Sequence, residues 1–189
     1  MAAKKAEQKA LVLAGGGMLS AVAEDLVANG WYVVLPSRRY SPPAARQVES
    51  RAHRSRRGRT EAGRAVWVEA EWMRPRELAR AADGALGGHA DLLVAWVHEA
   101  YRRSVLGVVE SLLAPGAPVV EVREGGWSDP VLTGRPTQGI VLGSVSERDS
   151  GRSLIQSEVV GGVAAAVARA LDGHPSTVHT LGQAGRVAR

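Results

Sequence analysis

The sequence predicts an α/β fold in which one parallel sheet carries helices on both faces. Short apolar runs alternate along the chain with longer segments that have the 3.6-residue period of an amphipathic helix. The short runs are apolar at successive positions, as strands buried on both faces are. A glycine cluster also joins the first apolar run to the first helical segment, at residues 14–17.

The first half of the chain predicts three strands and two helices. Residues 10–13 (ALVL) read as a buried strand, and 18–29 read as a helix with apolar residues along one face, ended by Gly30. The next expected elements are strands at 31–35 (WYVVL) and 65–70 (AVWVEA), then a helix at 76–86 closed by Gly87 and Gly88.

The second half continues the alternation. Its expected elements are, in chain order, a strand at 91–97, a helix at 101–113, strands at 118–122 and 139–142, a helix at 155–171 and an edge strand at 177–181. Together these elements predict a three-layer, doubly wound parallel sheet of six or seven strands, of the Rossmann type. The expected layout is one domain over 10–172, with a flexible N-terminal tail over 1–9 and a C-terminal strand and tail over 173–189.

Composition narrows the function classes. The chain has 189 residues, 45% of them hydrophobic, which suits one domain with a real core. It contains no cysteine, so disulfides, thiol chemistry and cysteine-ligated metals are excluded. No apolar run approaches the length of a bilayer and no secretory signal is evident, so we expect a cytoplasmic protein that does not enter the membrane.

The net charge of +5 is concentrated in one arginine-rich stretch. Nine arginines fall between Arg38 and Arg64, against only Glu49 and Glu61. Such a stretch can bind nucleic acid, or it can be a solvated surface. Because no aromatic residue between Arg46 and Arg64 offers a stacking platform, we expect the solvated surface rather than nucleic-acid binding.

The glycine cluster is placed where a parallel sheet binds phosphate. The free N–H groups at a helix N-terminus and the helix dipole favour an anion, and small residues let the backbone approach it. A bare turn is the alternative, but the cluster ends a strand and opens a helix, which favours nucleotide binding. The residues expected at the pyrophosphate are Gly15, Gly16, Gly17, Met18 and Leu19.

The residues after the second strand indicate which dinucleotide binds. An acid there would bind the ribose 2′-hydroxyl of NAD, whereas arginine suits the 2′-phosphate of NADP. The chain has Ser37, Arg38 and Arg39, with no acid before Glu49. These arginines are either phosphate ligands or further surface arginines, and we expect the cofactor to be NADP(H).

Residues 10–39 (ALVLAGGGMLSAVAEDLVANGWYVVLPSRR) resemble the cofactor-binding start of the short-chain dehydrogenase/reductase superfamily. They are most similar to short bacterial members with a GGTGML-type turn, and 91–98 and 139–171 resemble later parts of the same fold. The resemblance implies an acid near the adenine at Glu69. Ala95 and Trp96, which end the fourth strand, are expected beside the cofactor, Trp96 as packing or as a wall of the site.

The chain departs from that superfamily at the active site. Ala14 and Ser20 replace two glycines of the turn, both by small residues. The superfamily's Tyr-x-x-x-Lys pair is missing, because no lysine follows Lys9 and Tyr101 has Val105 four residues later. The proton relay of the resembled enzymes therefore does not operate here.

The best-placed substitutes follow the fourth strand, at the edge where a parallel sheet opens to its ligand. His98 is a candidate proton donor, with Tyr101 three residues later and Glu99 as a group that orients His98 or caps the helix. The alternative for His98 is a histidine bonded to the backbone at a helix start. Further polar residues follow the fifth strand (Glu124, Ser128, Asp129), and the histidines lack metal-ligand spacing, so no metal is expected.

The sequence alone leaves two functions open. One is an NADPH-dependent reductase of a small carbonyl or imine substrate, and the other is a catalytically silent NADP-binding sensor or partner subunit. A homodimer is expected because the helices after strands four and six carry small residues, including Gly161 and Gly162, that permit close approach.

Overall fold

A computed structural model describes residues 7–14, 17–38, 63–127, 129–144, 146 and 153–183. Its elements are, in chain order, β1 (Lys9–Ala14), α1 (Ser20–Ala28), β2 (Tyr32–Ser37), β3 (Arg64–Glu69), α3 (Pro75–Leu86), β4 (Leu92–Trp96), α4 (Glu99–Val109), the 3-10 turn η1 (Glu110–Leu112), β5 (Val119–Glu124), β6 (Thr137–Leu142), α5 (Gln156–Leu171) and β7 (Thr177–Leu181). All seven expected strands and all four expected helices are present.

The strands form one parallel sheet in the order β3-β2-β1-β4-β5-β6-β7. The chain builds outward from β1 to β3, then returns to β4 on the other side of β1 and builds outward again. The order therefore reverses between β1 and β4, which is where an open α/β sheet forms its ligand crevice. The predicted doubly wound, Rossmann-type sheet is confirmed.

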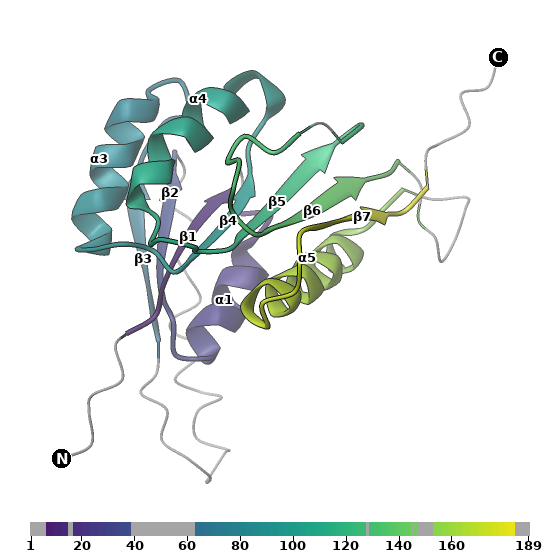
Figure 1. Cartoon of the computed structure of the whole chain (residues 1–189), viewed down its shortest axis with the longest axis horizontal. Helices are drawn as coiled ribbons and strands as arrows, with labels where there is room; N and C mark the ends of the chain where they lie inside the picture. The colour runs from purple at the N-terminus through teal and green to yellow at the C-terminus, as the bar shows by residue number, and fades with distance from the viewer. Residues whose placement is uncertain are drawn as a thin grey trace, which may run out of the picture.

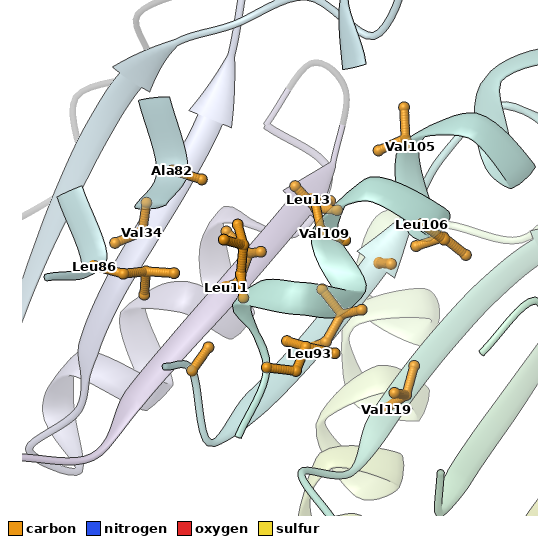
Figure 2. Packing of buried hydrophobic residues seen from close by; sticks show 14 of the residues in the cluster. Leu11, Leu13, Val34, Ala82, Leu86, Leu93, Val105, Leu106, Val109 and Val119 are labelled. Carbon is orange, nitrogen blue, oxygen red and sulfur yellow. The ribbon is translucent and has the colours of Figure 1, made fainter. Parts of the chain in front are cut away.

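Each strand of the sheet centre buries side chains on both faces. Figure 1 shows α3 and α4 on one side of the sheet and α1 and α5 on the other. Leu11 and Leu13 of β1 pack with α3 and α4, while Ala10 and Val12 pack toward α1 and α5. Figure 2 shows the first of these clusters, with Leu11, Leu13 and Val34 of the sheet facing Ala82 of α3 and Val109 of α4. This two-sided burial is why the strands read as unbroken apolar runs.

Some boundaries differ from the sequence prediction. The strand β1 begins at Lys9, within the stretch where the sequence predicts a flexible tail. The Lys9 ammonium donates to the Leu86 carbonyl at 2.7 Å at the end of α3. The helix after β4 begins at Glu99 rather than 101 and ends at Val109, followed by η1 rather than further α-helix. The strand β5 continues to Glu124, so Arg123 and Glu124 belong to the sheet rather than to the loop.

The sheet is not covered equally along its width. Over β6 and β7, the described residues place a helix on the α5 side only (Figure 1). On the α4 side, the chain between β5 and β6 runs alongside α4 instead. Arg102 near the start of α4 donates to the Asp129 carbonyl at 3.1 Å, and Arg135 donates to the Ala114 carbonyl beyond the helix end at 2.8 Å. The chain between β5 and β6 thus lies, without forming a helix in its described residues, where a crossover helix would cover the α4 side of the sheet.

The arginine-rich stretch falls mostly outside the described residues, which omit 39–62. No helix of the described chain is long and apolar enough to cross a membrane. Among the same residues, no group of three or more histidines and carboxylates is arranged to hold a metal ion.

Candidate functional site

The centre of the candidate site is the start of α1, directly after the central strand β1. The residue that caps α1 is Leu19, which has no polar side chain, and the first turn of the helix contains no acid. The turn before it contains Gly17, whose φ of 76° lies in the region that favours glycine. The N–H groups at this helix start therefore lack a side-chain cap, and the positive end of the helix dipole faces the crevice edge.

Of the residues expected at the pyrophosphate, three are described. Gly17 and Met18 lie in the turn, and Met18 is 37% exposed, whereas Leu19 is buried in the α1–α5 core. Leu19 therefore anchors the turn from inside, and contact with a ligand there would come from its backbone. Gly15 and Gly16 lie outside the described residues.

The residues expected to select the cofactor lie at the ends of β2 and β3. Ser37 is the last residue of β2, and Arg38 follows it with an exposed side chain. Ser37 lies opposite Glu69, the exposed last residue of β3, so the two predicted residues are neighbours at the edge. Arg39 lies outside the described residues.

The end of β4 lies next to the glycine turn. Trp96 is in register with Ala14, the last residue of β1, and is partly buried against the α1–α5 core. Ala95 is buried between Leu13 of β1 and Glu121 of β5. Trp96 is thus a packing residue that also borders the place where the glycine turn begins.

His98 caps helix α4. Its Nδ1 accepts a hydrogen bond from the Ala100 N–H at 3.2 Å, and the ring is exposed. With Nδ1 as acceptor, the neutral imidazole carries its proton on Nε2, which remains available as a donor. The structure therefore shows the alternative considered for His98, a histidine bonded to the backbone at a helix start. Only Nδ1 takes part in this bond, so Nε2 is not used by the cap.

Tyr101 belongs to a short row of aromatic rings above the ends of β3 and β4. Its ring centroid lies 6.2 Å from that of His98 and 6.4 Å from that of Trp72. Tyr101 is half-buried against the α3–α4 core. The two candidate proton donors thus lie side by side on the first turn of α4.

Glu99 has partners that the sequence did not predict. Its carboxylate bonds to Arg123 Nη2 of β5 at 3.1 Å and lies 3.6 Å from Arg102 Nη1 of α4. Arg102 in turn forms a buried ion pair with Glu121 of β5. We call these four residues the α4–β5 clamp: Glu99, Arg102, Glu121 and Arg123.

One signal in the sequence could have revealed the clamp. Glu121 interrupts the apolar run of the fifth strand, and a charged residue in a strand buried on both faces requires a charged partner. Of the polar residues noted after that strand, Glu124 is exposed, and Asp129 contributes its backbone carbonyl to Arg102. Ser128 lies outside the described residues.

The strand order, the glycine turn and the parallel pairing define the class of fold found in the short-chain dehydrogenases/reductases. The structure is similar to a 3-oxoacyl-(acyl-carrier protein) reductase from Brucella melitensis, with a TM-score of 0.60, 11% identity, and coverage of 98% of this chain and 100% of that chain. A short-chain dehydrogenase/reductase from Serratia marcescens gives a TM-score of 0.57 at 15% identity, with coverage of 94% and 96%.

A short-chain dehydrogenase from Oenococcus oeni gives a TM-score of 0.58 at 9% identity, covering 93% of this chain and 96% of its own. No family model and no curated protein matches the sequence. The fold expected from the resemblance of residues 10–39 is therefore confirmed at the level of three-dimensional structure.

Proposed function

We propose that this chain is a divergent short-chain dehydrogenase/reductase that binds NADP(H) and reduces a small carbonyl or imine substrate. The observation that carries the proposal is the uncapped start of α1, which follows the central strand at the point where strand order reverses. A helix start with no side-chain cap and no acid in its first turn favours a phosphate group. The similar solved structures named as reductases and dehydrogenases support the same reading.

The residues at this edge fit a phosphorylated dinucleotide. The backbone of the turn from Gly17 to Leu19 would hold the pyrophosphate, together with Gly15 and Gly16. Ser37 and Arg38, with Arg39, would hold the 2′-phosphate, because a guanidinium pairs with phosphate through two hydrogen bonds. Glu69 lies beside Ser37 and would border the adenosine part, and Ala95 and Trp96 would form a wall of the site.

A nicotinamide cofactor, when bound, supplies the hydride for such a reduction. The chain itself then has to orient the substrate and provide a proton. His98 presents Nε2–H as a hydrogen-bond donor while its Nδ1 caps α4, and Tyr101 presents a hydroxyl from the same turn. An imine that arrives already protonated needs neither donor, which suits a chain without the Tyr-x-x-x-Lys pair.

The capping role of His98 favours a second candidate function. Full protonation of the ring would place a hydrogen on Nδ1 and remove the acceptor that caps Ala100. Nδ1 therefore has a structural partner that does not depend on any reaction. The alternative is therefore an NADP-binding sensor or partner subunit without turnover.

A single pair of measurements separates these candidates. Fluorescence titration with NADPH measures binding, and loss of nicotinamide absorbance with a panel of small carbonyls and imines measures turnover. Binding with turnover supports the reductase, and binding without turnover supports the sensor or partner subunit. Absence of NADPH binding to folded protein contradicts both.

A further inference from the structure

The α4–β5 clamp lies next to the two candidate proton donors. Glu121 is in register with Ala95 of β4, only three residues before His98. Glu99 directly follows His98, and Arg102 directly follows Tyr101. All four charged groups of the clamp therefore attach to β5 or to the first turn and a half of α4.

Three of the clamp residues are buried. Arg102 is 5% exposed, Glu121 is 3% exposed and Arg123 is 7% exposed, while the Glu99 side chain reaches solvent. The cluster contains two positive and two negative groups, so its formal charges balance. Burying such groups is unfavourable unless each is paired, and the ion pairs of Arg102 with Glu121 and of Arg123 with Glu99 meet that requirement.

The clamp also holds the segment that replaces a crossover helix. Arg102 Nη2 donates to the Asp129 carbonyl at 3.1 Å, and the Arg123 guanidinium lies 5.4 Å from the ring centre of Trp127. The Trp127 ring lies on Gly139 of β6, where a Cβ would overlap ring atoms. The clamp thus joins α4, β5 and the segment after β5 at the carboxyl edge of the sheet.

Stability alone gives little reason for such a cluster. Replacing a buried ion pair by apolar residues of similar volume is often neutral or stabilising, because the desolvation of two charges offsets their attraction. What a directional ion pair adds is a fixed distance and angle between the elements that carry it. Apolar packing at the same place would permit small shifts of α4 against β5.

We propose that Glu99, Arg102, Glu121 and Arg123 are positioning residues, which fix the first turn of α4 and thereby hold His98 and Tyr101 in place for the reaction. This inference rests on the proposed reductase function for its catalytic consequence. Its structural part, that the clamp immobilises the first turn of α4, stands independently of turnover.

The test compares three variants of the full chain. Arg102→Met/Glu121→Leu replaces the buried ion pair with apolar residues, and Glu99→Gln removes the charge that pairs with Arg123. The matched control is Glu110→Gln, which removes the Glu110–Arg135 ion pair (3.9 Å) beyond the C-terminal end of the same helix. Each variant is measured for NADPH affinity, kcat, thermal midpoint, and amide hydrogen exchange at Ala100 and Tyr101.

These two amides report on the first turn directly, because Ala100 donates to His98 Nδ1 and Tyr101 donates to the His98 carbonyl. In the double variant we expect their exchange to be at least about tenfold faster. We expect kcat to be lower by about 10- to 100-fold, since small misplacements of reacting groups have effects of that size. NADPH affinity and the thermal midpoint should stay close to wild type. Glu99→Gln should change exchange and kcat in the same direction, and Glu110→Gln should change neither.

A folded double variant with wild-type exchange at Ala100 and Tyr101 would overturn the inference. If that variant does not fold, the exchange rates of the Ala100 and Tyr101 amides in Glu99→Gln test the inference instead. The Glu99 side chain is exposed, so this substitution leaves the core packing intact. If the wild-type protein shows no turnover, the proposed function fails, and the exchange rates alone decide whether the clamp holds the turn.

Discussion

At the scale of single residues, His98 combines two chemical capacities in one ring. Nδ1 accepts a hydrogen bond from the backbone of α4, and in the neutral ring Nε2 then carries the hydrogen and can donate it. A helix cap needs only a hydrogen-bond acceptor, whereas a proton donor needs a group that can transfer its proton. Asparagine can cap a helix but does not transfer protons as imidazole does. Substitution can therefore separate the two roles.

We expect His98→Ala to lose both the cap and any proton donation, and His98→Asn to restore only the cap. The loss of an N-cap typically lowers the free energy of unfolding by about 0.5–2 kcal/mol, and asparagine should recover most of it. If His98 donates the proton, turnover should fall by about 10²- to 10⁴-fold in both variants. Urea denaturation and kcat are the measurements. Near-wild-type turnover in His98→Asn would limit His98 to capping.

The exposed Arg38 provides the second test at this scale. We expect the double variant Arg38→Ala/Arg39→Ala to bind NADPH roughly 10- to 100-fold more weakly, because a charged hydrogen bond contributes about 1.5–3 kcal/mol. Its affinity for NADH, which has no 2′-phosphate, should hardly change. Titration with both cofactors checks the prediction, and equal affinity of the wild-type protein for NADPH and NADH would contradict it.

At the scale of elements, α1 is a helix that begins without a side-chain cap. Helices normally begin with a polar residue whose side chain bonds to the free N–H groups, and α1 begins with Leu19. The helix is held instead by burial of that leucine and of Val22, Ala23 and Leu26 in the core. The start of α1 is thus held by core packing rather than by a side-chain cap.

An acid introduced at this point should act in opposite directions on folding and on binding. We expect Ser20→Asp to leave stability unchanged or raise it by about 0.3–1 kcal/mol, because a negative charge favours a helix N-terminus. The same charge should weaken NADPH binding at least about tenfold by repelling the pyrophosphate. Ser20→Asn, of nearly equal size and no charge, is the matched control and should keep its affinity. Equal affinities in the two variants would mean that the phosphates bind elsewhere.

The two adjacent glycines of α5 provide an element-scale prediction about packing. A Cβ at Gly161 meets no atom within 4 Å, whereas a Cβ at Gly162 would overlap the Leu181 side chain of β7. We expect Gly161→Ala to raise the free energy of unfolding by about 0.5–1 kcal/mol through helix propensity. Gly162→Ala should lower it by about 1–3 kcal/mol, because Leu181 and β7 must shift. Chemical denaturation of the two variants measures both free energies of unfolding. A gain in stability for both variants would show that β7 can shift away from α5 at no cost in stability, which would contradict the prediction.

At the scale of the whole molecule, the sheet has one fully enclosed half and one thinly covered half. β1, β2 and β4 lie between two layers of helices, which gives the two core clusters. Beyond β5, the α4 side is covered by the segment after β5, which bonds to α4 and to the turn beyond it. The first turn of α4, which carries His98 and Tyr101, therefore lies between the enclosed half and the thinly covered half.

A homodimer stays a prediction, on narrower grounds than the sequence offered. Gly162 packs against Leu181 of the same chain and Ala166 is buried in the core, so neither is free for a partner. Gly161 and Ala165 remain exposed on α5. We expect a dimer in light scattering at micromolar concentration, and Gly161→Arg should shift it toward monomer. A wild-type monomer under those conditions would contradict the prediction.

The sequence by itself determined the class of fold, and it predicted the place of a phosphate-binding turn. Strands buried on both faces have continuous apolar runs, and helices buried on one face have a 3.6-residue period, so both leave local patterns. The glycine turn is equally local, since Gly15, Gly16 and Gly17 lie between a strand and a helix that the same patterns predict. The polar residues at the ends of β2 and β4 followed from the rule that parallel strands open to ligands at their carboxyl ends.

Only the tertiary structure decided which partners the charged residues near His98 and Tyr101 have. Glu99 and Arg123 are 24 positions apart, and Arg102 and Glu121 are 19 apart, so their pairing depends on how α4 packs across β5. The segment after β5 likewise gives no periodic signal, because its place is set by side chains such as Trp127 that pack on distant strands. Local patterns specify which faces are buried, whereas ion pairs between elements arise only once those faces are joined.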